Sequence, residues 1–98
     1  MFDDTIAAIS TAWGNSGIAI VRMSGAEAWN IAEKLVRFFS DAPMKSRFVR
    51  NAVLLDEAGE VIDHILVLPF RGPHSYTGED QVELHCHGGS LVAQRCLE

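Results

Sequence analysis

The sequence predicts an α+β domain with a five-stranded mixed sheet and two helices, in the order ββαβββα. Two apolar runs, residues 49–56 and 61–70, flank the short connection "EAGE" and predict a hairpin. The segment after "SGAE" repeats its apolar residues at helical spacing. Hairpins and helices mixed along one chain are typical of α+β proteins. With 98 residues, 48% of them hydrophobic, residues 1–98 are expected to form a single domain around one core.

The first two strands are predicted at residues 4–10, "DTIAAIS", and residues 18–24, "IAIVRMS". Both are short apolar runs, and only Arg22 interrupts the second with a charge. The intervening "WGNSG" is expected to form a loop, because Gly, Asn and Ser favour turns.

A helix is predicted to follow the second strand. Ser24 precedes Glu27 by three residues, the spacing of a capping box, in which each side chain bonds to an exposed amide at the helix start. Pro43 is expected to end the helical segment. Its apolar residues recur at helical spacing, and the predicted buried face is Ala28, Ile31, Ala32, Leu35, Val36 and Phe39.

The C-terminal part is predicted to form a loop, a strand and a helix. Gly and Pro residues keep residues 71–79 from regular structure, whereas residues 80–87, "DQVELHCH", alternate strictly and predict a strand. Residues 88–98 have the pattern of a helix with no stop signal before Glu98. We therefore expect the chain to be part of a longer protein.

The charge balance bears on partners and location. A net charge of -5 argues against this chain alone binding nucleic acid, which requires clustered basic residues. The start "MFDD" lacks the basic residues of a signal peptide, and no apolar run approaches the roughly 20 residues of a membrane span. We expect a cytoplasmic protein without a membrane partner, with Cys86 and Cys96 reduced. One basic cluster is interpreted as solvated surface: Lys34, Arg37, Lys45, Arg47 and Arg50.

The densest chemistry lies in the predicted strand at 80–87. Alternation puts Glu83, His85 and His87 on one face, and two imidazoles with a carboxylate suggest a small metal-binding domain. Residues four apart on a strand are about 13 Å apart, so these three side chains cannot readily share one ion. His64 or His74 would have to contribute a ligand. The alternative is that the histidines fill a polar interface or bond to backbone.

Two further features of this region have more than one interpretation. Cys86 falls on the apolar face and is interpreted as a small buried hydrophobe rather than a nucleophile. The charges of Arg22 and Glu83 are either solvated on an open sheet face or line a pocket. A carboxylate suits a ligand with two parallel N–H donors, such as a pterin or guanine, and an arginine suits a carboxylate, phosphate or ring carbonyl.

The order of four motifs resembles a known family. "DTIAAIST", "GIAIVRMSG", "GEVIDHILVLPF" and "SYTGEDQVELHCHGG" are similar to the N-terminal domain of the bacterial tRNA-modification GTPases MnmE, also called TrmE. The most specific block is the last of these, and the resemblance runs from Asp4 to about Leu91. One departure lies in the first loop, where Ala12 and Trp13 stand in place of the family's proline pair.

The resemblance implies a function. In that family this domain is an α+β tetrahydrofolate-binding fold that also forms a homodimer, and its ligand is 5-formyl-tetrahydrofolate or a related derivative. By motif position, Arg22 in "GIAIVR" and Glu83 in "EDQVE" match the folate contacts. The full-length protein acts with the flavoprotein MnmG (GidA) on carbon 5 of the wobble uridine of tRNA. GTP, Mg²⁺ and K⁺ bind in its GTPase domain, and this chain contains no GxxxxGK[ST] motif.

Glu83 is therefore expected to bind the pterin, and Glu83→Gln to weaken folate binding by roughly 2–3 kcal/mol with little change in stability. No catalytic residue and no metal ligand is assigned to this chain. Two alternatives remain: a dimerisation scaffold without ligand binding, and the metal-binding domain built on Glu83, His85 and His87.

Overall fold

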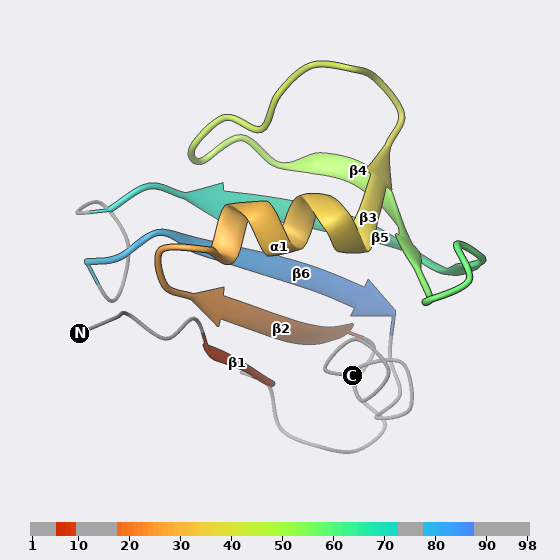
Figure 1. Cartoon of the computed structure of the whole chain (residues 1–98), viewed down its shortest axis with the longest axis horizontal. Helices are drawn as coiled ribbons and strands as arrows, with labels where there is room; N and C mark the ends of the chain where they lie inside the picture. Colours follow the sequence, from red (N-terminus) through yellow and green to blue (C-terminus); the bar gives the residue numbers. More distant parts are fainter. Residues whose placement is uncertain (1–5, 10–17, 73–77, 88–98) are drawn as a thin grey trace.

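A computed structural model describes residues 6–9, 18–72 and 78–87, and it has the predicted α+β fold (Figure 1). The described elements are β1 (Ile6–Ile9), β2 (Ile18–Ser24), α1 (Ala28–Leu35), β3 (Val36–Phe38), β4 (Arg50–Leu55), β5 (Val61–Phe70) and β6 (Gln81–His87). The helix predicted at 88–98 lies outside the described residues. No helix in the described part is long and apolar enough to cross a membrane.

The strands form one sheet in the order β1-β2-β6-β5-β4-β3. All five strand pairings in the described residues are antiparallel, so the predicted mixed sheet of five strands is instead an antiparallel sheet of six. The last described strand, β6, is central and pairs with β2 on one side and β5 on the other. Its side chains therefore have neighbours on both flanks.

The additional strand, β3, corrects the predicted helix. The helix was expected to include Val36 and Phe39, but it ends at Leu35, and Val36 takes an extended conformation with φ -128° and ψ 161°. Val36 and Phe38 pair with β4, and Val36 becomes buried. β-Branched and aromatic residues favour a strand over a helix once a neighbouring strand is present. Phe39 is left 68% exposed, outside the core.

The start of the helix also differs from the prediction. The residue at the N-cap position is Glu27, which makes no capping hydrogen bond with its side chain, and Ser24 lies at the end of β2. The predicted capping box is therefore wrong. Instead, the Glu27 side chain accepts a hydrogen bond from Asn30 one turn later. On the predicted buried face, Ala28 and Ala32 are fully buried and Ile31 is exposed.

The predicted hairpin between β4 and β5 is confirmed. The Asp56 side chain accepts hydrogen bonds from the amides of Ala58 and Glu60, and Gly59 takes a φ of +83°. An aspartate that bonds to amides ahead of it stabilises a tight turn, and glycine tolerates positive φ without a steric penalty.

The helix α1 packs across one face of the sheet, and we call this the helix face (Figure 1). Its side chains meet alternate residues of the strands in a single core; from β2 and β6 these are Ala19, Val21, Met23, Val82, Leu84 and Cys86. The intervening residues, including Arg22, Glu83 and His85, point to the opposite face, which we call the open face.

Candidate functional site

Arg22 and Glu83 lie opposite each other on adjacent strands. They are register partners in the β2–β6 ladder, although 61 residues separate them in sequence. The Arg22 guanidinium donates from Nε and Nη2 to a single oxygen of Glu83, Oε2, at 3.0 and 2.6 Å. The structure therefore brings together the two charged residues singled out in the sequence, as an ion pair on the open face.

Glu83 is a buried carboxylate with strong hydrogen-bond support. Its side chain is only 8% exposed, whereas that of Arg22 is 33% exposed. Burial alone raises the pKa of Glu83, but the hydrogen bonds and positive charges of Arg22 and His85 outweigh burial and leave the pKa below its ordinary value of 4.5. The carboxylate is therefore ionised at neutral pH and acts only as an acceptor.

His85 occupies the other oxygen of Glu83. Its Nε2 lies 3.0 Å from Glu83 Oε1, and because an ionised carboxylate cannot donate, Nε2 carries the proton. A carboxylate offers about four acceptor positions. Arg22 fills two of them and His85 fills one, so a ligand with two N–H donors must displace one of these three bonds.

His87 does not join this cluster. Its Nδ1 lies 2.7 Å from Oδ1 of Asp63 on β5, and its backbone amide donates to Oδ2 of the same residue. Cys86 points to the helix face and is buried. In the part of the chain that the structure describes, no group of three or more His, Cys, Asp or Glu side chains could hold a metal ion. His74 lies outside the described residues.

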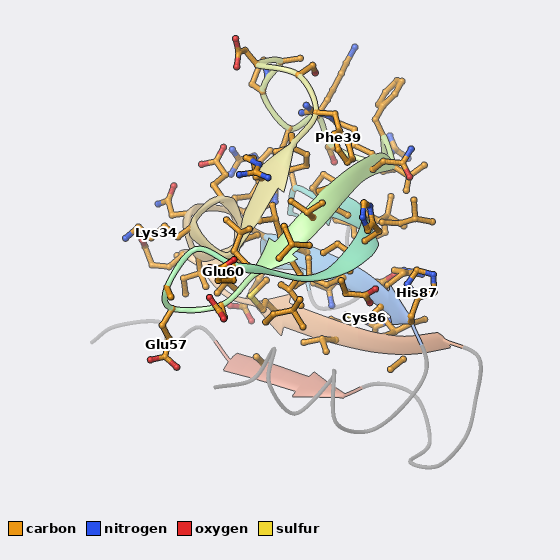
Figure 2. The ribbon with its side chains drawn as sticks, turned by 90° about the vertical axis from the view of Figure 1, so that its right-hand side faces the viewer. Lys34, Phe39, Glu57, Glu60, Cys86 and His87 are labelled. Atoms are coloured by element: carbon orange, nitrogen blue, oxygen red, sulfur yellow. The ribbon has the colours of Figure 1, made fainter. Side chains whose placement is uncertain are left out.

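A depression of about 430 Å³ adjoins the cluster on the open face. Its floor is formed by the start of β4, the middle of β5 and the end of β6, including Asn51 and Leu66. Phe39 borders it at the end of β3, and His87 borders it at the end of β6 (Figure 2). His85 lines the depression while its Nε2 contacts Glu83, so the two features are continuous.

Sequence reasoning missed several of these residues. Phe39 was assigned to the buried face of the helix, but it lies over the open face and stacks on His64 with a centroid separation of 6.4 Å. Asp63 carried no signal, because its contact with His87 depends on how β5 and β6 are aligned. The available sequence signal was the polar side chain of Asn51, which follows Arg50 and precedes the apolar residues of β4.

A second set of residues that the sequence did not single out holds the beginning of β6 in place. The Arg71 guanidinium stacks on the Trp29 ring at 3.6 Å and donates to Asp80 at 2.8 Å. Asp80 also accepts from the amide of Gly72, and the Trp29 ring nitrogen donates to the carbonyl of Phe70. These contacts tie α1 to the end of β5 and the start of β6, three residues from Glu83, and thereby fix the strand that carries the carboxylate.

Comparison with known proteins identifies the family. The family model for the GTP-binding protein TrmE N-terminus matches residues 5–98. The chain is 48% identical over 101 residues to the tRNA modification GTPase MnmE of Symbiobacterium thermophilum, covering 100% of this chain and 22% of that protein. It is 47% identical to the MnmE of Syntrophomonas wolfei, again covering 100% of this chain and 22% of that protein. It is 43% identical to the MnmE of Geotalea uraniireducens, covering 97% of this chain and 21% of that protein.

The chain thus spans about a fifth of the length of these relatives, and the match extends over its whole length. The aligned part includes both strands that carry Arg22 and Glu83. On this evidence the chain belongs to the MnmE (TrmE) family and corresponds to its N-terminal domain.

Proposed function

We propose that this chain is the tetrahydrofolate-binding and dimerisation domain of a tRNA-modification GTPase. The ligand is 5-formyl-tetrahydrofolate or a related derivative, which supplies a one-carbon unit when bound. The full-length protein hydrolyses GTP with Mg²⁺ and K⁺ in another domain and acts with the flavoprotein MnmG in the cytoplasm. Together they modify carbon 5 of the wobble uridine of tRNA. The family and the names of the relatives support this proposal.

The observation that carries ligand binding is the ionised, nearly buried carboxylate of Glu83 on the open face. A pterin presents a ring N–H and an exocyclic amine side by side. A carboxylate accepts from both, in a paired hydrogen bond whose acceptor is charged. The low pKa of Glu83 supports this role, because protonation would replace one acceptor with a donor.

Arg22 has two roles in this proposal. It keeps Glu83 ionised, and its guanidinium supplies five donors, of which Nε and one Nη2 donor bond to Glu83. When a pterin takes a position on the carboxylate, Arg22 or His85 gives up one bond. Arg22 is a third exposed, so its released donor can turn to a ring carbonyl of the ligand or to water.

Calorimetric titration of 5-formyl-tetrahydrofolate tests ligand binding. Glu83→Gln leaves an amide N–H facing a pterin N–H and should weaken binding by about 2 kcal/mol, or roughly 30-fold. Glu57→Gln, the same change at an exposed turn residue, should leave the affinity unchanged. Absence of binding by the unmodified protein, or equal affinities of the two variants, would contradict the proposal.

The alternative is a dimerisation scaffold without ligand binding. It is favoured by apolar side chains on the surface: Phe39, Phe48, Val49, Val61 and Leu66 are all more than 40% exposed. Exposed apolar residues that gather into one patch are typical of surfaces that meet another protein. Sedimentation tests dimerisation, and thermal unfolding with and without 5-formyl-tetrahydrofolate separates the two functions. A pure scaffold dimerises and shows no ligand-dependent rise in melting temperature.

A further inference from the structure

We infer that the depression beside His85 binds the arylamide part of the same folate, namely its aminobenzoyl ring and the carboxylates beyond it. This inference rests on the proposed function, because it extends the site from Glu83 along the open face. It assigns a ligand contact to Phe39, Asn51 and His64, whereas the resemblance assigned folate contacts to Arg22 and Glu83.

The first support is position. Leu66, in the floor of the depression, lies two residues along β5 from Leu68, which is the register partner of Glu83. The strand rise and the spacing between strands put Leu66 roughly 8 Å from Glu83, about the length of one fused two-ring system. A pterin that contacts Glu83 by one edge can therefore direct the substituent on its opposite edge into the depression.

The second support is shape and composition. A volume of about 430 Å³ lies within the range of small-molecule sites, roughly 300–1,000 Å³. The near-parallel rings of Phe39 and His64 form an aromatic wall with an angle of 16° between them. Aromatic rings pack favourably against such walls in offset or edge-to-face geometry.

The third support is the charge and hydrogen-bonding capacity of the lining. The described lining contains three imidazoles and no carboxylate, although the chain as a whole carries a net charge of -5. Asn51 also lines it, with an amide that can donate to a carboxylate and accept from an amide N–H. Two acids contact the lining histidines and are already paired: Glu83 accepts from His85, and Asp63 contacts His87 and accepts from the His64 amide. An anionic aryl amide is therefore the ligand class that these groups match.

The test compares two ligands and three variants. The ligands are 5-formyl-tetrahydrofolate and a tetrahydropterin in which a methyl group replaces the arylamide tail, and affinities are measured by calorimetry. Phe39→Ala and His64→Ala each remove part of the aromatic wall. Phe48→Ala is the matched control, because Phe48 is also exposed but lies outside the depression, beneath Lys45.

We expect the unmodified protein to bind the folate at least tenfold more tightly than the tailless pterin. Phe39→Ala and His64→Ala should each weaken folate binding about threefold to tenfold and leave pterin binding unchanged, as expected from the loss of an aromatic contact. Phe48→Ala should change neither affinity. Both variants alter exposed side chains, and circular dichroism confirms that they fold.

The results that would refute the proposed folate function differ from those that would refute only the assignment of the depression. If the unmodified protein binds neither ligand, the proposed folate function is refuted, and this inference with it. If it binds both ligands equally, or if Phe39→Ala and Phe48→Ala have the same effect on folate binding, only the assignment of the depression is overturned.

Discussion

Replacement of Glu83 by Gln should destabilise the fold even without ligand. In the structure, Glu83 accepts three hydrogen bonds, two from Arg22 and one from His85, and its side chain is 8% exposed. A glutamine offers one oxygen and one N–H₂ group, so one donor loses its acceptor and the ionic component of the Arg22 contact is lost. Removing one partner of a fully buried pair costs about 3–5 kcal/mol, but Arg22 is a third exposed and water can hydrate it. We therefore expect a loss of about 1–2 kcal/mol.

For a domain of this size, that loss corresponds to a melting temperature lower by about 5–15 °C at pH 7. The measurement is thermal unfolding followed by circular dichroism, with Glu57→Gln as the matched control. Glu57 is exposed at the turn between β4 and β5, and its replacement should shift the melting temperature by less than about 3 °C.

The same comparison at low pH separates the ion pair from simple packing. The pKa of Glu83 is lower in the folded protein than its ordinary value of 4.5, so its stabilisation is fully present above about pH 5 and is lost as the pH falls through the folded pKa. The difference between the two proteins should therefore be constant near neutral pH and shrink below pH 4.5. A difference that persists unchanged at pH 3, or equal melting temperatures of Glu83→Gln and Glu57→Gln at pH 7, would refute this reasoning.

Three further outcomes are expected from thermal or denaturant unfolding. Leu84→Ala on the helix face should cost about 2–5 kcal/mol, whereas Leu66→Ala on the open face should cost less than about 1; equal losses would mean that the core faces are misassigned. Gly72→Ala should destabilise by about 1–3 kcal/mol, because its Cβ would collide with the carbonyl oxygen of Gly78, and an unchanged midpoint would contradict that close approach. Gln81→Met should stabilise by about 1 kcal/mol, because neither polar atom of the fully buried Gln81 amide has a partner among the described residues; a loss of stability would reveal one.

Sequence patterns predicted every described strand except β3, because each of the other strands carries its own signal. The bounds of β2 and β5 coincide with the predicted runs, and β4 and β6 differ by one residue at one or both ends. The error at Val36 has a physical origin. Residues 28–39 contain apolar residues at helical spacing, and the pairing of β3 with β4 makes an extended conformation more favourable from Val36 on. Such pairing is a tertiary interaction, and the sequence of a short segment does not reveal it.

For the candidate site, the sequence could not predict how β2 and β6 are aligned. Alternation placed Glu83 and His85 on the same face, and that prediction holds. It could not show that Arg22 lies directly opposite Glu83, because shifting a strand by one residue turns every side chain to the other face. The resemblance to the family singled out both residues but not their contact. The contacts of Glu83 with Arg22 and His85 lead us to expect a loss of stability in Glu83→Gln, in place of the small change expected from the sequence.

The hydrogen bonds of Glu83 also constrain how a folate could gain affinity. A pterin that donates two hydrogen bonds to Glu83 and displaces one N–H of Arg22 or His85 raises the number of hydrogen bonds to the carboxylate only from three to about four. If the displaced donor belongs to Arg22, a charged donor is exchanged for a neutral one, and charge-assisted hydrogen bonds are the stronger kind. Contact with Glu83 then provides orientation and discrimination more than affinity. The remaining affinity must come from surface that the free protein leaves exposed, and beside Glu83 that surface is the depression between Phe39 and His85. A tailless pterin should therefore be recognised by Glu83 and still bind weakly.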